Sequence, residues 1–211
     1  NERVNGSIND IPYMTKSAYK NLDTNIPKLK KNIISKDKNN LKILISPHDF
    51  VDAPHSLGKF IFNDMVEWLE FLVKFSKETN YLWFIKNHPS MNDKWKPYQA
   101  YTRGVVDNII KNSNIILLDS SLPHNYLIKK IGINCVLTVS GQVAHEYAFN
   151  KIPVINASTR NIHSSFNFNF HARNIKNNKY LIKNFYKLKK NLNYDEVLPF
   201  YFMHYINRDK N

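Results

Sequence analysis

Residues 135–149 have the sequence CVLTVSGQVAHEYAF, in which a short apolar run stops at a serine and a glycine. The run at 135–139 has the length and composition of a buried strand, and residues 142–149 suit a short helix. A strand that passes through a tight turn into a helix is the repeating unit of a parallel α/β sheet. These residues therefore predict a sheet of parallel strands joined by helical crossovers.

The sequence on both sides continues this alternation. Further apolar runs predict strands at 41–45, 81–86, 115–118 and 154–156. Apolar residues at three- and four-residue spacing predict a helix over 59–77, and helices are also expected over 105–111 and 123–131, the last ending at Gly132. The fold class is therefore α/β, a Rossmann-like doubly wound parallel sheet of about five or more strands with helical terminal extensions.

Three segments are expected along the chain. Residues 1–40 are polar and broken by prolines, which favours an N-terminal arm or linker. Residues 41–175 are expected to form the Rossmann-like domain, and 176–211 a C-terminal helical extension packed on it. Within that extension, 179–192 has the pattern of a basic amphipathic helix. Because the sequence begins with Asn1 and not with Met, we expect it to be a piece of a longer protein.

The net charge of +13 favours anionic partners such as nucleotides, nucleic acid or an anionic membrane surface. Charge does not choose among them, because lysines scattered among Asn and Ile are also what an AT-rich coding sequence produces. No apolar stretch approaches the roughly 20 residues that cross a bilayer, and no signal-peptide pattern is present. A cytoplasmic location is expected. The single cysteine, Cys135, lies in a strand run and is expected to be a small core residue.

Polar residues follow two of the predicted strands. Lys86-Asn87-His88-Pro89 ends one of them, and Ser140-Gly141 ends another. The carboxyl ends of parallel strands meet at one edge of the sheet, where such folds bind ligands. A lysine, an imidazole, a hydroxyl and the backbone N–H groups of a loop that opens a helix suit a phosphate or diphosphate. His88 is the candidate catalytic residue, because a protonated imidazole would neutralise charge on a departing nucleotide.

Further candidates have alternatives that the sequence leaves open. Ser140 and Gln142 either contact the anion or belong to the start of the helix, where Ser140 would be the N-cap. Glu146 either binds ribose hydroxyls or pairs with Lys151 on the surface. Arg160 clamps a diphosphate or is a surface residue. The loop with His48 and Asp49, followed by Asp52 and His55, contacts sugar or acceptor or is solvated. A metal is disfavoured there because the loop gives no fixed ligand register. Asp119, Ser120 and Ser121 line a base or ribose pocket or cap the following helix.

Several of these segments resemble the nucleotide-sugar-binding, C-terminal half of bacterial capsule and surface-polysaccharide glycosyltransferases of the GT-B type, including sialyl- and Kdo-transferases. The resemblance is carried by 86–89, 138–148 and 151–155, and by Ser46-Pro47-His48-Asp49 ahead of Glu67-Trp68-Leu69. It implies that His88 and Ser140 contact the phosphate and nucleotide of a sugar donor. It also implies a missing N-terminal domain that binds the acceptor. Ser140 is followed by Gly141 and not by a second serine, a pattern closer to UDP-sugar enzymes and UDP-GlcNAc 2-epimerases, so the donor base stays open between CMP and UDP.

The expected function is transfer of a sugar from a nucleotide-activated donor to a growing surface polysaccharide such as capsule, without metal or cofactor. The expected partners are the nucleotide sugar, a polysaccharide or lipid-linked acceptor and the cytoplasmic face of the membrane, which 179–192 would contact. Nucleic acid is not expected as a partner. Two rivals are kept. One is a UDP-sugar epimerase or CDP-glycerol-type phosphotransferase, and the other is a nonenzymatic basic protein that binds nucleic acid or membrane surfaces.

Overall fold

The computed structural model describes residues 40–48, 50, 59–88, 97–120 and 122–206. Its centre is a sheet of six strands in the order β3-β2-β1-β4-β5-β6, with every neighbouring pair parallel. This is the strand order of the doubly wound nucleotide-binding folds. The strands are β1 (Lys42–Ile45), β2 (Leu82–Lys86), β3 (Ile116–Leu118), β4 (Cys135–Thr138), β5 (Val154–Asn156) and β6 (Phe170–His171).

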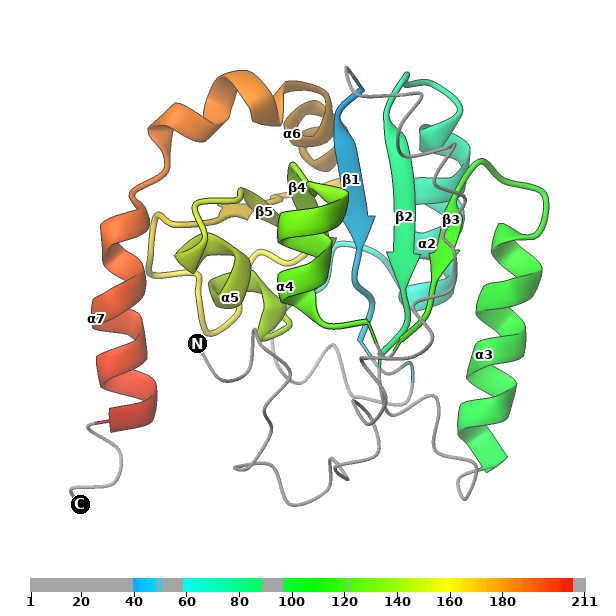
Figure 1. The fold of residues 1–211 in the computed structure, drawn as a ribbon, viewed down its shortest axis with the longest axis horizontal. Coiled ribbons are helices and arrows are strands. Elements are labelled where there is room, and N and C mark those ends of the chain that lie inside the picture. The colour runs from blue at the N-terminus through cyan, green and yellow to red at the C-terminus, as the bar shows by residue number, and fades with distance from the viewer. Residues whose placement is uncertain (1–39, 49, 51–58, 89–96, 121, 207–211) are drawn as a thin grey trace.

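Helices cover both faces of the sheet (Figure 1). Side chains of α2, α3 and α6 share one apolar cluster with alternate strand residues, and those of α4, the adjoining π-helical turn and α5 share the other. The helices are α2 (Met65–Ser76), α3 (Pro97–Ile110), α4 (His124–Tyr126), the π turn Leu127–Ile131, α5 (Val143–Phe149) and α6 (Ile175–Leu188). A 3-10 turn (Lys189–Asn191) follows α6. The last described elements are a second 3-10 turn (Tyr194–Glu196), α7 (Val197–Tyr201) and a second π turn (Phe202–Ile206).

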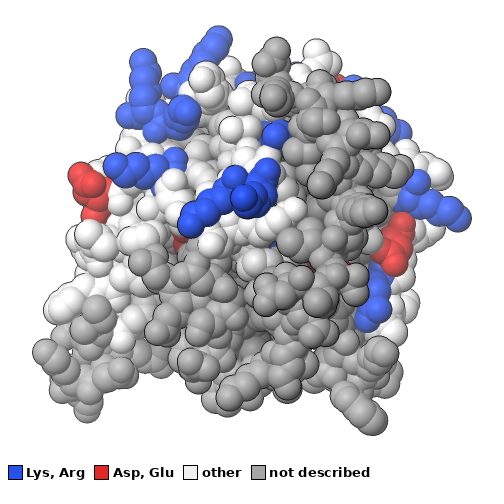
Figure 2. Space-filling model, viewed as in Figure 1, with Lys and Arg blue, Asp and Glu red and all other residues white. Residues whose placement is uncertain are grey.

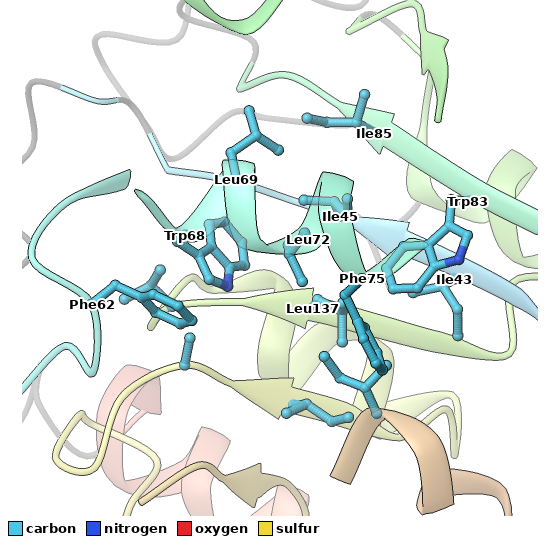
Figure 3. Close-up of a cluster of buried hydrophobic side chains, with 14 of the residues drawn as sticks. Ile43, Ile45, Phe62, Trp68, Leu69, Leu72, Phe75, Trp83, Ile85 and Leu137 are labelled. Carbon is cyan, nitrogen blue, oxygen red and sulfur yellow. The ribbon is translucent and has the colours of Figure 1, made fainter. Parts of the chain in front are cut away.

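The larger core lies between α2 and the central strands (Figure 3). Ile43 and Ile45 of β1 are fully buried there, and Leu69 and Leu72 of α2 meet them from above the sheet. Burying each such aliphatic side chain contributes about 1.5–3 kcal/mol to folding. Cys135 is fully buried in the same cluster, where it is a small core residue as predicted.

The predicted helix over 59–77 is wrong at its start, because α2 begins only at Met65. Asp64 caps it by accepting a hydrogen bond from Glu67 N–H at 2.8 Å. Glu67 Oε2 in turn accepts from Asn63 N–H at 2.7 Å, which completes a reciprocal cap. The preceding Phe60 instead forms an antiparallel bridge to Ser158. A buried aromatic residue at helical spacing is therefore part of a bridge between two loops.

Other boundaries also shift. α3 begins at Pro97 and not at residue 105, and α6 begins at Ile175 and not at residue 179. Residues 127–131 of the predicted 123–131 helix are π-helical, but the segment ends as predicted: Gly132 has φ 76° and its N–H bonds to Leu127 O at 2.9 Å. The strand β6 was not predicted. Its two residues lie in a polar, aromatic segment that has no strand periodicity.

Candidate functional site

The ends of β2, β1 and β4 bring the predicted motifs to one edge of the sheet. Ile45 pairs with Ile85 on one side and with Leu137 on the other. His48 lies three residues after Ile45, His88 three after Ile85, and Ser140 three after Leu137. In the strand order, β1 and β4 are also the neighbours at which the two halves of the sheet diverge, the position where doubly wound folds bind ligands.

His48 and Ser140 are joined directly. Ser140 N–H donates a hydrogen bond to His48 Nε2 at 3.1 Å. Because a backbone N–H can only donate, Nε2 is the unprotonated nitrogen and a neutral His48 carries its proton on Nδ1. The backbone N–H groups of this loop were expected to face an anion, and that of Ser140 instead donates to an imidazole. Both residues were candidates, but nothing in the sequence indicated that they contact each other across 92 positions.

Gly141 is needed for this close approach. A Cβ at that position would lie 3.1 Å from Thr138 Oγ1 and 3.3 Å from His48 Nε2, both tighter than ordinary contacts. Its backbone N–H makes no hydrogen bond within the part of the chain that the structure describes. The glycine therefore keeps an amide donor accessible beside His48.

Lys86 is a buried cation at the end of β2. Its side chain is only 2% exposed, and burial lowers its pKa to about 8, while the negative charges of Glu146 and Asp119 act in the opposite sense. At neutral pH the amine is therefore still mostly protonated. Glu146 is itself buried at 8% exposure, and its charge acts on Lys86, so its position favours the interior of the site over a surface pair with Lys151.

His124 adds a group that the sequence analysis missed. Its Nδ1 lies 3.1 Å from the Tyr147 hydroxyl, and the two rings meet nearly perpendicular at 5.4 Å. Burial holds the pKa of His124 well below its usual range, and the charges of Lys86 and His88 lower it further. Because the charges of Lys86 and His88 act on the pKa of His124, these three side chains lie close to one another. The signal that could have found His124 is its position directly after Pro123, at the start of the helix that follows β3.

A row of polar side chains crosses the carboxyl ends of β4, β5 and β6. Thr138 pairs in register with Asn156, and Asn156 with His171. Thr138 and Asn156 are fully buried, and Thr138 Oγ1, Asn156 Oδ1 and His171 Nε2 have no hydrogen-bond partner in the described ranges. Unpaired buried polar groups cost about 1–3 kcal/mol each, so a cluster of them at a sheet edge indicates a ligand-binding role.

The remaining predicted residues have separate outcomes. Gln142, and not Ser140, occupies the N-cap position of α5, but its side chain makes no hydrogen bond to the N-terminal N–H groups of that helix. Arg160 is exposed, and its carbonyl oxygen accepts hydrogen bonds from Lys59 N–H and Ser158 Oγ. Asp49, Asp52 and His55 lie outside the described residues, as does Ser121. Among the described residues, no group of three or more His, Cys, Asp or Glu side chains is arranged to hold a metal ion.

A second histidine cluster belongs to packing and not to this edge. His145 Nδ1 lies 2.9 Å from His163 Nε2, and His145 Nε2 lies 3.3 Å from the Tyr205 hydroxyl. Both imidazoles are buried among aromatic rings. The ring centroid of Phe200 in α7 lies 4.9 Å from the ring centroid of each imidazole. The cluster fastens the C-terminal helices to α5.

The surface charge is mainly basic in the view of Figure 2, where Lys and Arg side chains outnumber Asp and Glu. Part of the charge on α6 is paired locally. Glu78 lies 2.7 Å from Lys179 Nζ and 3.7 Å from Lys183 Nζ, and both ammonium groups lie over the Phe75 ring. No helix within the described ranges is both long enough and apolar enough to cross a membrane.

The strand order and the polar edge define a Rossmann-like parallel α/β fold with its candidate site at the switch point. No protein-family model matches the sequence, and no curated protein matches it significantly. Among solved structures, the chain is similar to a UDP-GlcNAc 2-epimerase from Neisseria meningitidis bound to UDP-GlcNAc, with 15% identity and a TM-score of 0.51 over 82% of this chain. The likeness at this identity shows the fold.

The wall teichoic acid polymerase TagF is also similar, with 14% identity and a TM-score of 0.45 over 83% of this chain. The chain spans 43% of the length of the epimerase and 43% of that of TagF. It corresponds in extent to less than half of either neighbour.

Proposed function

We propose that this chain is the donor-binding half of a glycosyltransferase that transfers a sugar from a nucleotide-activated donor to a growing surface polysaccharide. One observation carries the proposal: His88, His48 and Ser140 follow three neighbouring strands at matching positions across the switch point. An anionic group placed there would meet the imidazole of His88, the hydroxyl of Ser140 and the amide of Gly141. Buried Lys86 would add a positive charge close by.

The chemistry of this proposal is stabilisation of a leaving group. When the bond from the sugar to the nucleotide breaks, negative charge develops on the phosphate oxygens. A protonated His88 and the Lys86 ammonium would stabilise that charge in a site with little water. Glu146 would accept hydrogen bonds from ribose hydroxyls. The base that activates the acceptor hydroxyl would come from the N-terminal half that we expect in the full protein.

A thermal-shift screen against CMP, UDP, CDP and GDP tests the proposal. One nucleotide should raise the melting temperature of the chain, since a ligand at 100 times its Kd adds about 2.7 kcal/mol of stability. His88→Ala and Ser140→Ala should lose this gain. Asn112→Ala, at an exposed residue just before β3 and hence towards the amino ends of the strands, should keep it. If no nucleotide stabilises the wild-type chain, or if both variants respond like wild type, the proposal fails.

The second candidate is a UDP-sugar epimerase, favoured by Gly141. A Cβ at position 141 would lie 3.3 Å from His48 Nε2 and 3.1 Å from Thr138 Oγ1, so the second serine of the CMP-sugar enzymes would be crowded here. Product analysis of the full-length protein with UDP-GlcNAc separates the two. An epimerase alters the configuration of the sugar with no acceptor present, whereas a transferase needs one and releases the nucleotide.

A further inference from the structure

A pocket of about 330 Å³ lies along β6, and His48, His88 and Ser140 are not among the residues that line it. It is formed by the edge strand itself, by the loop after β5 and by the turn after α6. Pockets for small ligands measure about 300–1,000 Å³, so this one suits a single small molecule and not a whole nucleotide sugar. Its lining comprises Thr159, Asn167, Asn169, Phe170, His171, Arg173, Asn191 and Leu192.

The lining is chemically selective. It has one strong cation, Arg173, and none of its described residues is acidic. The side-chain amides of Asn167 and Asn191 can exchange hydrogen bonds with hydroxyl groups, and the Thr159 hydroxyl, which donates to Lys59 O at 3.4 Å, can still accept one. Phe170 and Leu192 supply apolar surface. A planar guanidinium binds carboxylate or phosphate oxygens in pairs. The combination matches a small anion that also carries several hydroxyl groups.

Unpaired buried groups at the pocket support a ligand there. His171 Nε2 is buried and makes no hydrogen bond of standard geometry in the described part of the chain, although the backbones of His163 and Phe166 interact with this ring. Asn156 Oδ1 is also unpaired among the described residues, but it lies behind the lining, on the fully buried residue that pairs with His171 in register. The carboxylate of Glu196, which contacts a lining residue, is already engaged, because it accepts from Asn167 N–H at 2.6 Å and from Asn193 Nδ2 at 3.0 Å.

The pocket is also placed for a second ligand group. His171 lies two strands from Thr138 at the end of β4, which at the usual strand spacing is about 10 Å along the sheet. We propose that this pocket binds an anionic monosaccharide unit, held by Arg173 through its carboxylate or phosphate. The proposal rests on the proposed function for its sugar chemistry. In a transferase the unit would belong to an acidic acceptor chain.

Titrations of the ¹⁵N-labelled chain with glucuronate, glucose 6-phosphate and glucose test this by NMR. We expect saturable shifts around β6 with one or both anions and none with neutral glucose, and the two anions separate carboxylate from phosphate recognition. Arg173→Gln should weaken binding at least about tenfold, the loss of a charge-assisted hydrogen bond. Lys176→Gln removes one exposed positive charge from the next helix and should bind like wild type.

Two results would overturn the pocket proposal. One is the absence of saturable shifts with either anion, and the other is equal binding by wild type and Arg173→Gln. The nucleotide screen separates this failure from failure of the donor site. Arg173→Gln should keep the full nucleotide-induced rise in melting temperature, because the pocket and the switch point are different places on the sheet.

Discussion

At the scale of single residues, Gly141 has the clearest steric requirement. Gly141→Ala places a Cβ 3.3 Å from His48 Nε2 and 3.1 Å from Thr138 Oγ1, so one of these groups must move. We expect a loss of about 1–3 kcal/mol in the free energy of unfolding, as for other overpacked sites, and a weaker His48 contact. Urea unfolding measures the loss, and the nucleotide-induced shift should fall with it.

Gly104→Ala is the matched control for that substitution. Gly104 lies within α3, and a Cβ there meets nothing within 4 Å. Alanine loses less backbone entropy on folding than glycine, so this variant should gain about 0.5–1 kcal/mol. If Gly141→Ala and Gly104→Ala change the free energy of unfolding equally, crowding does not explain the requirement for glycine at position 141.

The sequence predicts which residues lie at the site edge, because the end of each predicted strand places them there. It does not predict which of these residues contact one another. His88 and Ser140 were placed at one edge because both follow apolar runs, and parallel strands bring their carboxyl ends together. The contact from His48 to Ser140 depends on the register of β1 against β4, which local pattern does not specify. The row from Thr138 to His171 was missed for the same reason, and because β6 is only two residues long.

At the scale of elements, α2 depends on its first turn. Asp64→Ala removes the side-chain acceptor of Glu67 N–H and should cost about 1 kcal/mol, the usual value of an N-cap. Asp64→Asn keeps an acceptor and should lose much less. Chemical denaturation of the three proteins measures the difference. Equal stability of wild type and Asp64→Ala would mean that water or another group caps the helix.

Strand and helix types follow from the sequence better than helix starts do. Every strand of three or more residues lies within a predicted run, because an apolar stretch that ends at Ser, Asn or Lys has few other structures available. The start of α2 could not be placed by periodicity, since Phe60 and Ile61 continue the apolar spacing of the helix. Their partners lie in the loop after β5, where Ile61 N–H bonds to Ala157 O at 3.1 Å.

At the scale of the whole molecule, buried histidines couple stability to pH. His163 is fully buried, and burial together with nearby His145 lowers its pKa to about 2 from an ordinary 6.5. The unfolded chain therefore binds a proton that the folded chain refuses, so stability must fall as pH drops below 6.5. Between pH 6.5 and 5 this one residue should cost about 2 kcal/mol, at 1.36 kcal/mol per pH unit.

Two measurements check that expectation. Urea unfolding across this pH range should give a steeper fall for wild type than for His163→Gln, which has no titrating ring. In the folded wild type, the His163 imidazole resonance should not titrate down to pH 5. Titration near 6.5, or parallel slopes for the two proteins, would contradict it. Because His145 and His163 fasten α7 to α5, we expect the amide protection factors of the C-terminal helices to fall first as the pH is lowered.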